Sequence, residues 1–214
     1  MFVGPPRHGK SNIIAWHLEP CRSVVIFDSK RHPDEWARWG PKHGYVVSED
    51  PVDISHHAKV VHQVDNRALT DRGGWTKPGR IGYRWTEALA RFIARGHTIG
   101  VFDETVQTLP AGLAHPDARR IQTQGAAFGS GGWFGTQIAN CIDTLIPRLS
   151  EHAFVFRMVG REERARLASA RAVDCDVLAT LGGPNSEQDR RFEFAYHRMG
   201  DDAWTVCGAV DQVM

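Results

Sequence analysis

The feature that most constrains the fold is an eight-residue segment, Gly4-Pro5-Pro6-Arg7-His8-Gly9-Lys10-Ser11, which matches G-x-x-x-x-G-K-[ST] without a break. It follows a short apolar segment, Met1 to Val3, and precedes a helix-like stretch, Asn12 to Leu18. A strand, a glycine-containing loop and a helix in this order form a cradle for phosphate groups, because backbone N–H groups and the helix N-terminus point at the anion. The sequence therefore predicts a nucleotide-binding α/β protein.

The residue types of this loop suggest specific roles in binding ATP and Mg²⁺, the two predicted cofactors. Lys10 would reach the β- and γ-phosphates, and the Ser11 hydroxyl would bind Mg²⁺. The remaining contacts to the phosphates are expected from the other residues of the loop and the first turn of the helix, namely Gly4, Pro5, Pro6, Arg7, His8, Gly9 and Asn12.

An apolar run from Thr98 to Phe102 ends in two acids, Asp103 and Glu104. Asp103 is predicted to hold Mg²⁺ through water, and Glu104 to orient and deprotonate an attacking water. Kinases and GTP switches usually lack the adjacent glutamate, so the pair favours ATP hydrolysis. A further strand ends in Thr136-Gln137, and Gln137 is predicted to donate a hydrogen bond to the γ-phosphate.

Short β-type runs alternate with helical patterns along the chain, which indicates an α/β sheet with crossover helices. The length of 214 residues, without a linker or repeat, predicts one domain over residues 1–214, with a C-terminal β-hairpin at about residues 190–208. The predicted strands are Met1 to Val3, Ser23 to Asp28, Tyr45 to Val47, Lys59 to Val64, Thr98 to Asp103, Trp133 to Thr136 and His152 to Met158. Helical spacing or charge pairing predicts helices around residues 85–93 and from Arg161 to Arg171.

The order of these features predicts a RecA-like P-loop NTPase core of the ASCE type, a mostly parallel central sheet flanked by helices. In that arrangement an extra strand separates the phosphate-loop strand from the acid-pair strand. Four widely spaced cysteines predict reduced thiols, and the apolar runs are too short to span a membrane. The net charge of +1 gives no uniform attraction to nucleic acid.

With these motifs the chain resembles the FtsK/HerA superfamily of DNA-pumping ATPases. Val24 to Lys30 looks like the family's second strand ending in Asp-x-Lys, and Asp103-Glu104 like its hydrolytic acid pair. Thr136-Gln137, with Ile146-Pro147 and Phe154 to Arg157, looks like its Thr-Gln segment and following strand. The compact size is similar to the genome-packaging ATPases of tailless, membrane-containing icosahedral viruses.

This resemblance implies a homo-oligomeric ring, usually hexameric, that hydrolyses ATP at subunit interfaces and moves double-stranded DNA into a preformed capsid without reading its sequence. It also implies capsid or membrane vertex proteins as partners. The expected location is the host cytoplasm during assembly, or a virion vertex.

Hydrolysis at an interface requires an arginine from the neighbouring subunit. Arg119 and Arg120 lie on a predicted helix between the acid pair and the glutamine strand, where FtsK-like proteins carry this arginine, and Arg120 is the first choice. Arg148 and Arg157 are alternatives, and a solvated helix face is the simpler interpretation of Arg119-Arg120.

The segment from Asn66 to Arg84 is predicted to be an irregular, basic loop that could hold DNA phosphates, with Trp75 available for stacking. Its basic residues outnumber its one acid, Asp71, and they are Arg67, Arg72, Lys77, Arg80 and Arg84. An exposed loop or a subunit or capsid contact is the alternative.

Two other functions fit parts of the sequence. A nucleotide kinase would need an acceptor site and an arginine-rich lid, which Arg161 to Arg171 could imitate. Another FtsK/HerA-type translocase, or an ATPase of phage assembly or export, would share the motifs but move a different substrate.

Overall fold

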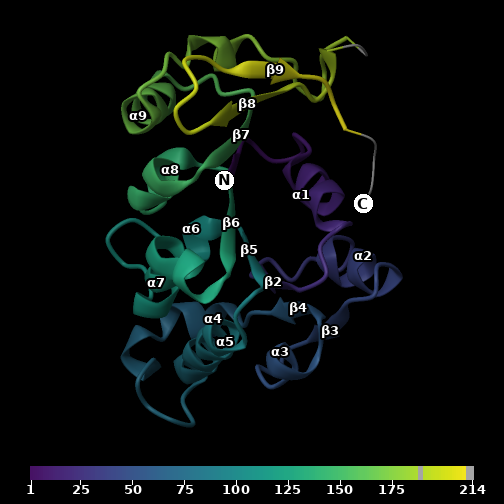
Figure 1. Ribbon diagram of the computed structural model, residues 1–214, viewed down its shortest axis with the longest axis vertical. Coiled ribbons are helices and arrows are strands. Elements are labelled where there is room, and N and C mark those ends of the chain that lie inside the picture. The colour runs from purple at the N-terminus through teal and green to yellow at the C-terminus, as the bar shows by residue number, and fades with distance from the viewer. Residues whose placement is uncertain (188–189, 211–214) are drawn as a thin grey trace.

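The computed structural model describes residues 1–187 and 190–210, and within them nine strands form one sheet in the order β3-β4-β2-β5-β6-β1-β7-β8-β9 (Figure 1). Neighbours from β3 to β7 pair in parallel, whereas β7–β8 and β8–β9 are antiparallel. The strands are β1 (Phe2–Val3), β2 (Val24–Asp28), β3 (Val46–Ser48), β4 (Lys59–Gln63), β5 (Ile99–Asp103), β6 (Gly131–Thr136), β7 (His152–Phe156), β8 (Phe194–Arg198) and β9 (Thr205–Cys207).

All seven strands predicted from apolar runs are present, and their bounds differ from the predicted ones by no more than two residues. The reason is visible in β2, whose five residues are all buried. Val24 and Ile26 pack into one apolar cluster, and Val25 and Phe27 into a second cluster on the opposite face of the sheet. A strand covered on both faces has to be apolar throughout, and such a run stands out in a sequence.

Helices cover both faces of the sheet (Figure 1). Apolar residues of α1 and α2 pack on one face, and those of α3, α4, α5, α7, α8 and α9 pack on the other. The α-helices are α1 (Lys10–Leu18), α2 (Trp36–Lys42), α3 (Asp53–His56), α4 (Asn66–Thr70), α5 (Ile81–Arg95), α6 (Thr105–Thr108), α7 (Pro116–Gln124), α8 (Leu145–Leu149) and α9 (Arg161–Arg171). Short 3₁₀ segments are η1 (Arg72–Gly74), η2 (Gly125–Phe128), η3 (Ala139–Cys141) and η4 (Asp176–Ala179).

The strand that precedes the phosphate loop is short and lies inside the sheet. Phe2 and Val3 of β1 pair with Gly135 and Thr136 of β6 on one side, and with β7 on the other. Because β6 separates β1 from β5, the extra strand expected of a RecA-like core is present. The phosphate loop, the acid pair and Gln137 therefore all follow strands that end at the same edge of the sheet.

The predicted C-terminal hairpin is formed by β8 and β9, and Arg171 of α9 is hydrogen-bonded to its first strand. The Arg171 side chain is buried and donates hydrogen bonds to the carbonyl oxygens of Ser150 (2.8 Å) and His197 (3.2 Å). One domain over residues 1–214 stays a prediction, since residues 188–189 and 211–214 lie outside the described residues.

The prediction of an irregular loop from Asn66 to Arg84 is wrong at both ends. Residues 66–70 form α4, and residues 81–84 are the first turn of α5. Trp75 is partly buried, donates a hydrogen bond to the Ala68 carbonyl oxygen (3.3 Å) and packs on the His115 ring, with 4.5 Å between the ring centroids. It is therefore part of the packing under this segment and is not free to stack on a base.

Candidate nucleotide site

The phosphate loop connects β1 to α1 and lies against Phe156 at the end of β7. Gly9 has φ +93°, the left-handed region that glycine tolerates best, and it caps the N-terminus of α1. A Cβ atom on Gly4 would come within 2.6 Å of the Phe156 Cβ, so only glycine lets the loop pack this closely. The loop thus keeps the strand–loop–helix geometry that its sequence predicts.

Lys10 is buried and turned onto its own loop. Its ammonium group donates hydrogen bonds to the carbonyl oxygens of Gly4 (2.6 Å) and Pro5 (2.9 Å). These two carbonyls occupy the donors that a β- or γ-phosphate would use, so the side chain is already held at the centre of the loop.

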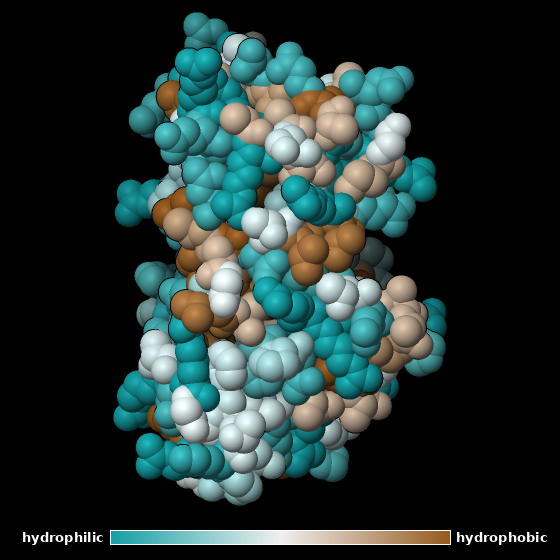
Figure 2. Space-filling view, turned by 90° about the vertical axis from the view of Figure 1, so that its left-hand side faces the viewer, coloured by the Kyte–Doolittle hydropathy of each residue, from teal (hydrophilic) through white to brown (hydrophobic). Residues whose placement is uncertain are grey.

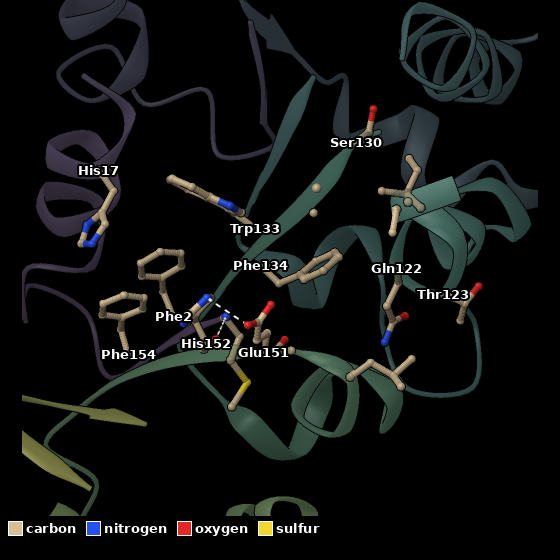
Figure 3. A pocket seen from close by; sticks show the side chains of 18 of the residues that line it. Phe2, His17, Gln122, Thr123, Ser130, Trp133, Phe134, Glu151, His152 and Phe154 are labelled. Atoms are coloured by element: carbon tan, nitrogen blue, oxygen red, sulfur yellow. Dashed lines mark hydrogen bonds and ion pairs between the residues drawn. The ribbon is translucent and has the colours of Figure 1, made fainter. Parts of the chain in front are cut away.

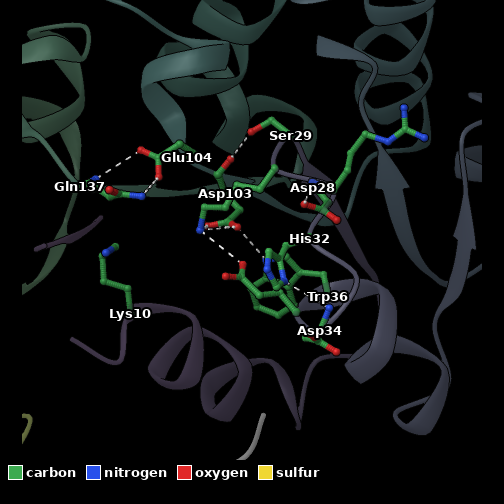
Figure 4. Close-up of polar contacts among 12 residues, drawn as sticks. Lys10, Asp28, Ser29, His32, Asp34, Trp36, Asp103, Glu104 and Gln137 are labelled. Atoms are coloured by element: carbon green, nitrogen blue, oxygen red, sulfur yellow. Dashed lines mark hydrogen bonds and ion pairs between the residues drawn. The ribbon is translucent and has the colours of Figure 1, made fainter. Parts of the chain in front are cut away.

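The first acid, Asp103, ends β5 and is held from the neighbouring strand β2. The Lys30 ammonium forms an ion pair with Asp103 Oδ2 (3.1 Å), and the Trp36 indole donates a hydrogen bond to the same oxygen (3.0 Å) (Figure 4). Ser29 Oγ also donates to the Asp103 carbonyl oxygen (2.8 Å). Lys30 and Trp36, which follow β2, therefore orient this carboxylate, and Ser29 holds the backbone of Asp103.

The second acid, Glu104, is bonded to Gln137. Gln137 Nε2 donates to Glu104 Oε2 at 2.6 Å, and the Gln137 backbone N–H donates to Oε1 at 3.4 Å (Figure 4). Glu104 has φ +56°, a backbone conformation that costs a non-glycine residue about 1 kcal/mol or more and is concentrated at functional sites. The structure thus joins the proposed base and the proposed γ-phosphate sensor, and the contact of Gln137 with phosphate stays a prediction.

Sequence reasoning did not identify Lys30 and Trp36 as site residues. The Asp-x-Lys pattern contains Lys30 but assigns it no contact, and Trp36 belongs to no pattern in the sequence. The signal for Lys30 was its position just after a strand that pairs with the acid-pair strand in register, with Asp28 opposite Asp103. No local pattern pointed to Trp36, because its contact with Asp103 spans 67 residues.

A cavity of about 760 Å³ extends over the phosphate loop and its surroundings. One end is polar and includes Lys30, Glu35 and Gln137, while the middle is formed by Gly9 to Ile13. The donor set also fits Mg²⁺, because the Ser11 hydroxyl and the Asp103 carboxylate are hard oxygen ligands of the kind that this ion takes alongside phosphates and waters. Within the described residues, no group of three or more His, Cys, Asp or Glu side chains is placed to bind a metal without a nucleotide.

No protein-family model matches the chain, and no curated protein matches it in sequence. Solved structures do. The genome-packaging NTPase B204 of Sulfolobus turreted icosahedral virus 2 in complex with ATPγS matches with a TM-score of 0.71 and 15% identity, over 98% of this chain and 96% of that chain. The AMPPCP complex of that protein gives 0.69 and 17% over 98% and 95%, and the DNA-packaging ATPase B204 of Sulfolobus turreted icosahedral virus gives 0.68 and 17% over 98% and 96%.

The chain has a P-loop NTPase fold. This likeness confirms the fold class and the resemblance to viral packaging ATPases that the motifs indicated. At these identities it concerns the fold, and the roles of individual residues depend on the geometry described above.

Within the P-loop NTPase fold, the surroundings of the site shift the pKa values of Lys10 and Lys30 in opposite directions. Burial, followed by the nearby charge of Lys30, lowers the pKa of Lys10 to about 8. Burial also acts to lower the pKa of Lys30, but the carboxylates of Asp103 and Glu35 outweigh it and raise that pKa. Lys30 is therefore a fixed positive charge, while Lys10 changes its charge near pH 8.

Affinity for a triphosphate is expected to fall as the pH rises above about 8. In the free protein Lys10 loses its proton there, instead of near its usual 10.5. A bound polyphosphate favours the charged amine, so binding takes up a proton above pH 8 and becomes weaker with pH. Titration calorimetry in two buffers of different ionisation enthalpy measures this uptake. An affinity that stays constant between pH 7.5 and 9.5 would contradict the lowered pKa.

The candidate interface arginines differ in their exposure and in their contacts. Arg119 forms an ion pair with the buried carboxylate of Asp143 (2.6 Å), so it already has a structural partner. Arg120 is exposed on α7, with its guanidinium 5.8 Å from the centre of the Phe128 ring. Arg148 and Arg157 are also exposed. The geometry favours Arg120 over Arg119 as a group that reaches another molecule.

The predicted DNA-contacting residues are all exposed, namely Arg67, Arg72, Lys77, Arg80 and Arg84. They extend from α4, which follows the carboxyl end of β4, to the first turn of α5. Arg67 forms an ion pair with Asp65 (2.8 Å), which lowers its value as a phosphate ligand. Contact with DNA stays a prediction for all five residues.

A second cavity, of about 670 Å³, lies at the amino ends of β1, β6 and β7 (Figure 3). Phe2, Trp133 and Phe154 contribute aromatic rings to it, and Gln122 contributes an amide with no hydrogen-bond partner among the described residues. Ligands of parallel sheets bind at the carboxyl ends of the strands, so this cavity is not assigned to the nucleotide.

Proposed function

We propose that the protein is a Mg²⁺-dependent ATPase that translocates viral double-stranded DNA into a preformed capsid. The observation that carries the proposal is the convergence of Lys10, Asp103, Glu104 and Gln137 at one edge of the sheet, with a carboxylate suited to activate water. The fold that the chain shares with structures of a genome-packaging NTPase supports the choice of DNA as the transported substrate.

Each site residue has a distinct role in the proposed reaction. Lys10 leaves the Gly4 and Pro5 carbonyls and binds the β- and γ-phosphates, and Glu104 takes the proton of the attacking water on its carboxylate. Gln137 keeps that carboxylate oriented and donates to the γ-phosphate. Ser11 and Asp103 would hold Mg²⁺, which neutralises charge on the transferring phosphoryl group. Lys30 and Trp36 act through Asp103 as positioning residues.

Double-stranded DNA is expected to raise the rate of phosphate release from ATP severalfold, independently of its sequence. Contacts to the phosphate backbone are salt-dependent. A variant with Arg72→Glu, Lys77→Glu and Arg80→Glu should therefore lose the stimulation and keep the basal rate, whereas a control with Arg38→Glu and Lys42→Glu on α2 should keep both. Stimulation by a membrane partner and not by DNA would favour an export ATPase, and transfer of phosphate to an acceptor would favour a kinase.

We also propose a ring, usually hexameric in proteins of this kind, in which Arg120 reaches the neighbouring site. Support comes from exposed apolar side chains next to the helices on the side that carries α7. Leu113, Leu149 and Val159 are 53%, 52% and 69% exposed; Leu113 and Val159 precede α7 and α9, and Leu149 ends α8. Figure 2 views this side, where apolar side chains gather at mid-height among polar ones. Burial of such groups against a second subunit would favour assembly.

Mixing two inactive variants is expected to restore turnover. In a ring, Arg120→Ala subunits offer an intact Glu104, and Glu104→Gln subunits offer an intact Arg120. Random assembly of equal amounts gives about one competent interface in four, because a head-to-tail interface takes one element from each subunit. Phosphate release by the mixture measures this. No recovery at any ratio would argue against an arginine acting in trans. The same experiment with Arg148→Ala in place of Arg120→Ala is the matched comparison.

The proposal includes capsid or membrane vertex proteins as partners, and the host cytoplasm or a virion vertex as the location. Among the described residues, no helix is long and apolar enough to cross a bilayer.

A further inference from the structure

The cavity over the phosphate loop has an apolar end that the proposed hydrolysis does not use. Besides the loop, it is lined by Phe156, Arg191, Phe192, Phe194, Ala209 and Val210. All six residues lie in or next to the C-terminal hairpin or at the end of β7, far in sequence from the loop, and the segment after β9 runs back toward α1 (Figure 1). The phosphate loop is therefore covered from one side by apolar groups.

The strand order fixes which end of a nucleotide lies there. Glu104 and Gln137 follow β5 and β6, on one side of β1, so the γ-phosphate and the attacked bond must lie on that side. Phe194 begins β8, which lies beyond β7 on the other side of β1, and Phe192 lies in the segment just before β8. A triphosphate held over β1 therefore directs its nucleoside toward β7 and β8.

Phe192 is placed as a binding group and not as a core residue. Its ring is only partly buried, and it belongs to neither of the two apolar clusters formed by the described residues. Its φ of +62° is a strained conformation for a side chain of this size, which is typical of ligand clamps.

Neighbouring contacts hold the strained residue in place. The Arg191 guanidinium lies 5.3 Å from the centre of the Phe192 ring, and its Nε donates to the Pro184 carbonyl oxygen (2.9 Å). On the other side, the Glu193 carboxylate accepts a hydrogen bond from the Gly182 N–H (2.7 Å). The ring is thus presented to the cavity by a segment fixed at both of its neighbours, which lowers the entropy cost of binding.

We propose that Phe192 stacks on the base of the bound nucleoside triphosphate, with Val210 completing the apolar wall of a base-binding site. This inference rests on the proposed function for the identity of the ligand. Val210 packs against the cluster that contains Phe156 and Phe194, so the wall joins the phosphate loop to the hairpin. Because every base has an aromatic face, stacking favours large purine rings and distinguishes poorly between adenine and guanine.

The test compares ATP with inorganic tripolyphosphate, which has the same phosphates but no base. Phe192→Ala is expected to weaken ATP binding by about 10- to 100-fold, as loss of one base–aromatic stack does, and to leave tripolyphosphate binding unchanged. Phe192→Tyr keeps the ring and should bind ATP as the original protein does, while Phe192→Leu keeps apolar volume and should resemble the alanine variant. Val206→Ala, an exposed position on β9, is the hairpin control.

Three results would overturn the inference: unchanged ATP affinity in Phe192→Ala, equal losses for ATP and tripolyphosphate, or full affinity in Phe192→Leu. These outcomes are separate from the proposed function, which fails if the original protein binds ATP but releases no phosphate. GTP affinity within about threefold of ATP affinity would agree with recognition by stacking alone. Strict preference for one purine would contradict it, since polar groups would then have to read the base.

Discussion

Lys10→Ala protein is expected to lose at least about 100-fold in affinity for ATP, and with it all measurable turnover, because charge-assisted hydrogen bonds to phosphate are the strongest single contacts a phosphate loop offers. The side chain is buried at the centre of the loop and already bonded to two of its carbonyl oxygens. Its removal takes away the charge and leaves the Gly4 and Pro5 carbonyls without their donor. Equilibrium binding of a fluorescent ATP analogue measures the loss.

The control for this experiment is Lys42→Ala, which removes an exposed lysine at the end of α2. It should bind ATP as the original protein does. Nucleotide binding of Lys10→Ala within threefold of the original would mean that the loop does not hold the phosphates, and the nucleotide site would have to be sought elsewhere.

Glu104→Gln protein is expected to bind ATP normally and to hydrolyse it about 1,000-fold more slowly, since a positioned general base typically contributes between 10² and 10⁴ in rate. Glutamine has the same shape and can keep the contact with Gln137, but its amide cannot accept a proton from water. Binding and phosphate release measured on the same preparation separate the two effects. Glu19→Gln, at an exposed position after α1, is the matched control. Normal turnover by the Glu104→Gln protein would show that another group acts as the general base.

The core of the fold could be predicted because its signals are local. The strands are apolar runs of a few residues, the phosphate loop is a contiguous segment, and α9 was predicted with its observed bounds, Arg161–Arg171. Asp103 and Glu104 end such a run, so their position at the edge of the sheet followed directly from the sequence.

The rest of the site depends on contacts between segments that the sequence does not connect. Trp36 meets Asp103 because β2 pairs with β5, and Gln137 meets Glu104 because β6 lies beside β5. Phe192 reaches the cavity from the segment just before β8, more than 180 residues from Lys10. The packing of Trp75 also depends on a distant segment, because the His115 ring lies against it.

The two-residue strand β1 has a mechanical consequence. Among the described strands, it alone joins the part of the sheet from β3 to β6 to the part from β7 to β9. So short a ladder offers few hydrogen bonds against bending, and the sheet should flex there more easily than between β2 and β5, which pair over five residues. A nucleotide with its γ-phosphate on one part and its base on the other would then be a second link across this hinge, so that its binding and its cleavage alter the angle between the two halves of the subunit.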